Sequence, residues 1–346
     1  MSEAGAGRRG VVIGLVVLLL ASAGLGALIL TGAVGDGDGD SASPRSTLTT
    51  NATPRSSTST STTILEQGEG AVIAVNAAGE VVLLDADSGA QRFVLLDGID
   101  VSDPAKNGIT LAPADGVAYV VKPAQSIVDS EILRVPIARG QPSTTIAKGL
   151  APAVSPDGTS LAYVQVVSSD GRLKPAVVIR DLVTGKEQRF APSESNAPSI
   201  FISDVAWSPS GNSVLFIAGE VQSGLFSLDP TKATTLDDAK RLGPEVIPGE
   251  EQSWFAVTPF GGRLAVGERV GERRSATYRV IEVDLAGSPQ GSLLEATDRF
   301  FRIDARTGGG VLLFVAEVRP EGGRLLRARP GSAPEEIATG IIVATW

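Results

Sequence analysis

The chain of 346 residues contains no cysteine and no histidine. Without cysteine there can be no disulfide, no thiol nucleophile and no cysteine-based zinc site. Without histidine the chain lacks the usual general base, the serine–histidine–aspartate triad and the commonest ligand of transition metals. No credible catalytic or metal-ligand spacing replaces them. We therefore predict a protein that is not an enzyme and that uses no cofactor and no metal.

Positive charge is in deficit as well. The sequence has 30 Lys and Arg residues against 39 Asp and Glu residues, which gives a formal net charge of −9. An acidic surface repels nucleic-acid phosphates and anionic membrane surfaces. We therefore expect no nucleic-acid partner for the main part of the chain.

Charged residues are absent between Gly10 and Gly35, in the apolar segment "GVVIGLVVLLLASAGLGALILTGAVG". About 20 apolar residues are enough for a helix to span a bilayer, and basic residues before it favour a cytoplasmic N-terminus. We predict a cytoplasmic stub at 1–9, a transmembrane anchor helix at 10–35 and an extracytoplasmic remainder, in a single-pass protein of the plasma membrane. The alternative is a cleaved signal peptide, with Ala21-Ser22-Ala23 or the Gly32-Ala33 region as candidate cleavage sites.

Large hydrophobic residues are scarce in 36–66. Ser and Thr dominate this segment from Ser41 to Thr63. A segment of this composition cannot bury enough apolar surface to fold by itself. We predict a flexible, disordered linker at 36–66, followed by one folded domain at 67–346.

A short polar turn recurs in the folded part. In "AVSPDGTSLAYV", from Ala153 to Val164, a Ser-Pro-Asp-Gly turn separates two apolar runs, and related turns occur at intervals of about 43 to 53 residues. This period is typical of a propeller blade or another repeat array. The other copies begin at Leu111, Ala206, Ala256 and Ile303.

A second polar turn follows the same period, most clearly as Asp-x-x-Ser/Thr-Gly at Asp85–Gly89 and Asp181–Gly185. The segments between the turns are short, rich in Val, Ile, Leu and Ala, and bounded by Gly, Pro and Asp, which is typical of strands. The body begins with "AVIAV", like the strand after the Ser-Pro turn, and the chain ends with "IIVATW", like the strand before it. We predict an all-β, six-bladed β-propeller in which the C-terminal strand pairs with the first blade and closes the ring.

The Ser-Pro turns and the apolar strands after them, best preserved at Ser155–Val164 and Trp207–Ile217, resemble the TolB-like propeller repeat, a WD-type β-propeller. The resemblance covers about residues 70–346 and implies the fold much more than the function. In such propellers, ligands and partners bind on one face, through loops around a central channel. The resemblance places six candidate binding residues on loops that lead into the innermost strands: Lys148, Asp204, Glu251, Gln252, Asp298 and Arg299.

Two more candidates, Arg273 and Arg274, lie in the basic segment "GERVGERRSATYR". Arginine forks recognise carboxylates and phosphates, so this segment is a candidate anion or partner site. An exposed hairpin of alternating charge would explain the same residues without any ligand.

These observations favour a non-catalytic, membrane-anchored propeller that acts as a protein-interaction or scaffold module of the cell envelope, with another envelope protein as its partner. Two alternatives remain open. One is a ligand-sensing propeller that binds a glycan, a peptide or a cation at the channel mouth. The other is a hydrolase or lyase that uses carboxylate catalysis.

Overall fold

The computed structural model describes residues 70–346 except for ten short internal ranges, and all the described residues belong to one compact unit. In the described residues the regular elements are β-strands and three short 3₁₀ helices, which confirms the predicted all-β class. The 3₁₀ helices are η1 (Pro104–Lys106), η3 (Ile127–Asp129) and η5 (Leu236–Asp238). The ranges left out are 113–114, 170, 194–200, 220–222, 244–251, 272–275, 297–299, 306–310, 317–320 and 330–331.

Four of the sheets each contain four antiparallel strands that are consecutive in the chain. The first contains β4 (Ile109–Ala112), β5 (Val117–Lys122), β6 (Glu131–Pro136) and β7 (Thr144–Lys148). The second contains β8 (Leu150–Val154), β9 (Ser160–Ser169), β10 (Arg172–Asp181) and β11 (Glu187–Phe190). The third contains β12 (Phe201–Trp207), β13 (Val214–Gly219), β14 (Gly224–Leu228) and β15 (Lys240–Leu242). The fourth contains β16 (Gln252–Phe260), β17 (Arg263–Val270), β18 (Thr277–Val283) and β19 (Pro289–Ala296).

The fifth sheet has seven strands and joins the two ends of the described chain. Its last strand, β23, pairs with β22 through its first half and with β1 through its second half. The strand "IIVATW" therefore lies beside the strand "AVIAV", as the sequence predicts. In sheet order the strands are β20 (Phe300–Ala305), β21 (Leu312–Ala316), β22 (Gly323–Ala328), β23 (Glu335–Thr345), β1 (Ala71–Asn76), β2 (Val81–Asp85) and β3 (Gln91–Leu96).

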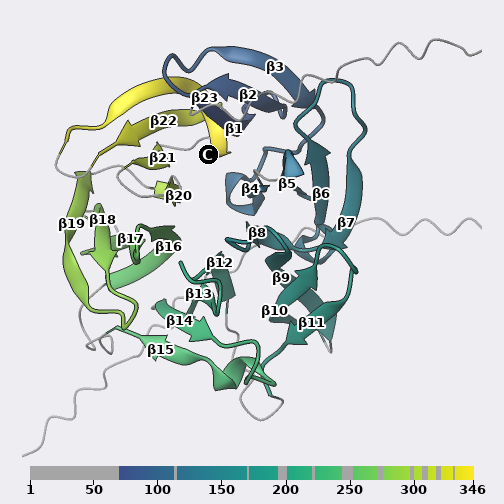
Figure 1. The fold of residues 1–346 in the computed structure, drawn as a ribbon, viewed down its shortest axis with the longest axis vertical. Helices are drawn as coiled ribbons and strands as arrows, with labels where there is room; N and C mark the ends of the chain where they lie inside the picture. Colours follow the sequence, from purple (N-terminus) through teal and green to yellow (C-terminus); the bar gives the residue numbers. More distant parts are fainter. Residues whose placement is uncertain are drawn as a thin grey trace, which may run out of the picture. The chain divides into compact units, whose positions relative to one another are not determined.

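The sheets of this unit are arranged around a common centre, as in a propeller (Figure 1). The strands β4, β8, β12, β16 and β20 lie near the middle, whereas β3, β7, β11, β15 and β19 lie on the outside (Figure 1). Within each four-stranded sheet the chain passes from one strand to the next antiparallel strand. Short strands separated by turn residues favour this meander because a hairpin is enough to connect antiparallel neighbours. The arrangement brings residues that are far apart in the sequence together at the centre.

Hydrophobic contacts between neighbouring sheets hold the unit together. Among the described residues there are six buried clusters, and each combines side chains from two adjacent groups of strands. In one, Val164 of β9 packs with Trp207 of β12; in another, Val82 of β2 packs with Leu325 of β22. Burying a Val or Leu side chain contributes about 1.5–3 kcal/mol, so every interface adds stability.

The Ser-Pro turns close the hairpins between innermost strands and their neighbours. In the turn from β8 to β9, the Ser155 hydroxyl donates to the Asp157 carboxylate and accepts from the Ser160 N–H at 2.9 Å. Gly158 takes a φ of 75°, which glycine adopts without steric cost. The copy at Thr258 differs from the predicted turn because β16 continues to Phe260, and only two glycines link it to β17.

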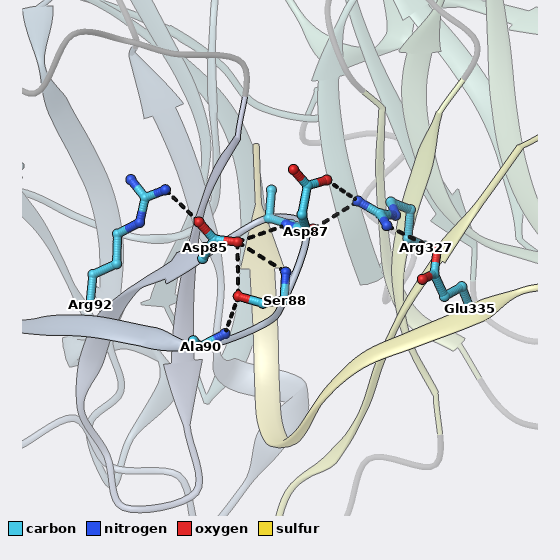
Figure 2. Close-up of polar contacts among 8 residues, drawn as sticks. Asp85, Asp87, Ser88, Ala90, Arg92, Arg327 and Glu335 are labelled. Atoms are coloured by element: carbon cyan, nitrogen blue, oxygen red, sulfur yellow. Dashed lines mark hydrogen bonds and ion pairs between the residues drawn. The ribbon is translucent and has the colours of Figure 1, made fainter.

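The second type of turn lies further out. At the end of β2, the Asp85 carboxylate accepts from the backbone N–H groups of Asp87 and Ser88 at 3.1 and 2.9 Å, and it forms an ion pair with Arg92 at 2.6 Å. Figure 2 shows these contacts converging on one partly exposed carboxylate. Asp residues form such turns because their side chains bond their own following backbone.

This outer turn also contacts β22 near the end of the chain. Arg327 of β22 donates to the Ala86 carbonyl at 2.8 Å and to the Asp87 carboxylate at 3.0 Å, and it bonds Glu335 of β23 at 2.9 Å (Figure 2). The first and last parts of the described chain are thus joined at the rim by a charged hydrogen-bond network.

The predicted stub at 1–9, anchor helix at 10–35 and linker at 36–66 lie outside the described residues. No helix within the described part of the chain has the length and apolar character needed to cross a bilayer. The predicted single-pass location in the plasma membrane is therefore not supported, and we correct it.

Candidate functional site

A cavity of about 720 Å³ lies between the innermost strands. Its wall continues to the Ser-Pro turns, where the exposed residues Asp157 and Gly262 belong to the lining. This places the mouth of the cavity at the face that carries these turns. Each innermost strand contributes to the wall, for example through Thr110, Ala153, Trp207, Thr258, Asp304 and Thr345.

The wall of the cavity is mostly apolar. The prolines at the repeated turn positions, Pro156, Pro209 and Pro259, all line the cavity. Two tryptophans, Trp207 and Trp346, stand at the ends of β12 and β23. Pockets of 300–1,000 Å³ with apolar walls and a few polar groups are typical of ligand and peptide sites.

A charged group occupies one side of the channel. The guanidinium of Arg302 in β20 lies 3.2 Å from Oδ1 of Asp204 in β12, with exposed side-chain fractions of 15% and 5%. The strand β16 lies between β12 and β20 in the chain order, so this ion pair reaches across the inner edge of one sheet. A buried ion pair costs desolvation, so its presence calls for a structural or functional explanation.

Asp304 lies two residues further along β20 and also lines the cavity. Its Oδ2 atom accepts from the Thr345 hydroxyl at 2.8 Å and from the Trp346 N–H at 2.9 Å. The Thr258 hydroxyl donates to Oδ1 at 3.4 Å. The oxygens of Asp304 are therefore already used by neighbouring innermost strands.

A similar hydrogen bond recurs between innermost strands. In three places, a backbone N–H donates to a side chain of the preceding innermost strand. Two of the donors lie two positions before a turn proline, and the third takes the equivalent position in the repeat. These bonds join Val154 N to Thr110 Oγ1, Val257 N to Asp204 Oδ2 and Trp346 N to Asp304 Oδ2, at 3.4, 3.0 and 2.9 Å. They satisfy backbone donors that a buried sheet edge would otherwise leave unpaired.

Irregular strand register helps to aim these side chains. The pairing of β12 shifts between Ile202 and Asp204, and the pairing of β20 shifts between Phe300 and Arg302. Bulges bend a strand locally and redirect the side chains next to them. Asp204 and Arg302 each follow such a shift directly, which fits their placement toward the channel.

Burial raises the pKa of two carboxyls at this site. Desolvation raises the pKa of Asp204, and the nearby Arg302 charge and the Val257 N–H oppose that rise. Desolvation also raises the pKa of Asp304, against the hydrogen bonds from Trp346 and Thr345. Perturbed carboxyls that line a cavity are common at functional sites.

The structure brings few of the predicted site residues together. Asp204 is a buried residue inside β12, so its assignment to a loop was wrong, and its link to the channel is the ion pair with Arg302, which lines the cavity. Lys148 is exposed and forms an ion pair with Asp129 at 3.0 Å, at the opposite end of the strands from the cavity mouth. Gln252 begins β16. Five others lie outside the described residues: Glu251, Asp298, Arg299, Arg273 and Arg274.

Sequence reasoning missed Arg302 and Asp304. Both lie in "FRIDA", a segment that aligns with innermost strands that are mostly apolar. In the repeat alignment Asp304 takes the position of Val154 and Val257, so a charge at a normally apolar inner position was the available signal. Within the described ranges, no group of three or more acidic side chains is arranged to hold a metal ion.

No protein-family model matches the sequence, and no curated protein sequence matches it either. Solved structures do resemble the chain. TolB from Acinetobacter baumannii superposes with a TM-score of 0.54 at 15% identity, over 80% of this chain and 65% of that one. The chain therefore spans slightly less than two thirds of TolB, and at this identity the likeness shows a TolB-like propeller fold.

Enzymes occur among the similar structures. They include an oligogalacturonate lyase in complex with manganese, at 14% identity and a TM-score of 0.48 over 75% of this chain and 70% of that one. A puromycin-hydrolysing peptidase of Mycobacterium tuberculosis matches at 16% identity and a TM-score of 0.49, over 79% and 44%. Because folds of this kind also occur in enzymes, the fold gives no support to the prediction that the protein is not an enzyme, and we withdraw that prediction.

Proposed function

We propose that the described residues form a six-bladed propeller that docks a protein partner at the face carrying the Ser-Pro turns. Six buried clusters between neighbouring groups of strands support six blades. The double pairing of β23, with β22 and with β1, supports closure of the ring through the C-terminal strand. In this view the seven-stranded sheet is two blades that share β23.

The cavity is the single observation that carries the docking proposal. It is about 720 Å³ in volume, its wall combines prolines and tryptophans with one charged group, and its mouth is surrounded by turns from several sheets. A partner that inserts a segment into the cavity would touch these turns at the same time. Rigid strands hold the turns in place, so little ordering entropy is lost on binding.

Photo-crosslinking from defined positions tests this proposal. A photoreactive residue at Pro209, on the cavity mouth, is expected to capture one dominant protein in cells. The same residue at Leu173, in the hairpin between β9 and β10 at the other end of these strands, is the matched control because its side chain is 55% exposed. Equal capture from both positions, or capture from Leu173 alone, would contradict docking at the Ser-Pro face.

One observation favours a second candidate function, carboxylate-based hydrolysis or elimination. Asp304 is a buried carboxyl that lines the cavity, and desolvation raises its pKa, as it does in carboxyls that act as general acids. The test is turnover of glycoside, uronide and peptide substrates by the wild type, Asp304→Asn and, as a control, Asp229→Asn at an exposed turn. Turnover by the wild type and by Asp229→Asn but not by Asp304→Asn would support this candidate. No turnover by the wild type would dismiss it.

A further inference from the structure

Arg302 is a charged residue in a mostly apolar cavity wall, and binding by shape alone does not require a charge there. Its side chain extends from β20 to Asp204 of β12, and it lines the cavity. Burying a guanidinium to this extent is unfavourable unless its N–H groups find partners. A residue that served only to fill space there would carry no charge.

Arg302 brings hydrogen-bond donors to the wall of the cavity. A guanidinium has five N–H donors in a planar fork. Among the residues that the structure describes, the Asp204 carboxylate is the one polar partner of Arg302, and the contact involves a single Nη atom. Asp304, by contrast, already accepts from Thr345, Trp346 and Thr258.

We infer that Arg302 binds a carboxylate that a protein partner presents on an apolar segment. This inference rests on the proposed docking function and names the chemistry of the docked group. The prolines and tryptophans of the wall would contact the apolar part, while N–H groups of Arg302 that Asp204 does not bind would donate to the carboxylate oxygens. Arginine is suited to this role because its fork matches the two oxygens of a carboxylate.

Charge favours a carboxylate over a phosphate. Asp204 and Asp304 flank Arg302, and the whole chain carries a net charge of −9. A doubly charged phosphate would meet more repulsion from these groups than a singly charged carboxylate does. A cationic group would face the Arg302 fork itself, and the Asp304 oxygens that could receive it are already engaged.

Peptide pools of matched composition test the inference on the purified full-length chain. The first pool holds N-acetylated tripeptides of Ala, Val, Leu, Pro and Phe with free C-terminal carboxylates, and the second holds the same tripeptides as C-terminal amides. A third pool of amides contains one Glu, and a fourth contains one Lys. Bound peptides are identified by affinity selection with mass spectrometry, and Trp207 and Trp346 give a fluorescence signal from the cavity.

Carboxylate peptides are expected to bind about ten-fold or more tightly than their amide counterparts, as for a charged hydrogen bond. Preference for the first pool over the third would identify a chain terminus, and the reverse would identify a side chain. Either result supports the inference. Equal binding of acids and amides, tighter binding of the Lys pool, or no binding of any pool would overturn it.

A double variant shows whether Arg302 causes the preference. Asp204→Asn with Arg302→Met removes both charges and leaves no unpaired buried ion. Arg263→Met with Glu282→Gln removes a comparable pair at the surface, where the two groups are 2.9 Å apart. The acid preference should vanish in the first variant and persist in the second; persistence in both would overturn the assignment to Arg302.

The failure of this inference can be distinguished from the failure of the docking proposal. Crosslinking from Pro209 without acid preference would leave docking intact and remove the carboxylate. Acid preference without crosslinking to a protein would leave Arg302 as a carboxylate site and remove the protein partner.

Discussion

The carboxylates at the channel and those at the outer turns behave in opposite ways. Asp204 and Asp304 lie on innermost strands, and desolvation raises the pKa of both. Asp229, in an exposed outer turn, has a pKa lowered to about 2 by hydrogen bonds from Lys232 and Thr231. The Arg92 hydrogen bond and the Ser88 N–H likewise lower the pKa of Asp85.

This difference in pKa direction distinguishes carboxylates that form turns from carboxylates that lie at the proposed docking site. An exposed Asp that bonds its own turn is explained by the local backbone alone. A buried Asp that accepts a hydrogen bond from the backbone N–H of a neighbouring strand connects two blades. It also places a charged group beside a cavity. The outer carboxylates are therefore structural, whereas the inner group combines a structural role with the proposed docking site.

Removing Arg302 should produce the largest effect. Arg302→Met leaves the Asp204 carboxylate buried without its cation, which is expected to reduce the free energy of unfolding by about 4 kcal/mol. Urea denaturation measures the change. The double variant with Asp204→Asn should recover most of the loss, and a double variant no more stable than Arg302→Met would show that the two groups are not coupled.

The outer turn is expected to depend on its backbone more than on its carboxylate. Gly89 has a φ of 66°, and a Cβ there would lie 1.5 Å from the Ile337 carbonyl oxygen of β23. Gly89→Ala should cost about 3 kcal/mol, because backbone must move to admit the methyl group. Gly98→Ala, at a φ of 78° in open space, is the control and should cost about 1 kcal/mol. Similar losses in both variants, measured by thermal unfolding, would argue against tight contact at this junction.

Asp304 should matter through its acceptor oxygens. Asp304→Ala leaves the Trp346 N–H and the Thr345 hydroxyl without their acceptor, at a cost of about 2 kcal/mol. Asp304→Asn keeps one acceptor oxygen and should be better tolerated at neutral pH. Equal destabilisation by the two variants would contradict this account of Asp304.

The pH dependence should have opposite signs in the two regions. A carboxyl with a raised pKa contributes stability at low pH that is lost as the pH rises through its folded-state pKa. The wild type should therefore lose stability relative to Asp304→Asn as the pH rises above about 4. For Asp229, whose pKa is lowered, the wild type should lose stability relative to Asp229→Asn as the pH falls below about 4. Unfolding midpoints over a pH series give both slopes, and slopes of the same sign would remove the contrast.

The repeat pattern predicted much of the fold. Turns such as Ser155–Gly158 are local, so their residue preferences appear directly in the sequence. The pairing of the C-terminal strand with the first described strand was also predictable, because the two ends of the chain carry complementary halves of one turn.

The site was much less predictable. Asp204 comes together with Arg302 and Asp304, which lie about 100 residues later in the sequence, through the arrangement of the sheets. Their approach depends on blade geometry and on register shifts in β12 and β20, which no local pattern specifies. The sequence favoured polar residues such as Lys148 as binding candidates because they were expected on exposed loops. In the structure Lys148 lies at the end of the strands opposite the cavity mouth.

Plugging the cavity mouth tests the central claim most directly. Gly262 lines the mouth and has open space around a Cβ, so Gly262→Trp should fold and obstruct the cavity. Gly291→Trp, at an equally open position on the outer strand β19, is the matched control. The affinity for the protein captured from Pro209 should fall at least about ten-fold in Gly262→Trp and stay unchanged in Gly291→Trp. Unchanged affinity in a folded Gly262→Trp variant would contradict docking at the cavity.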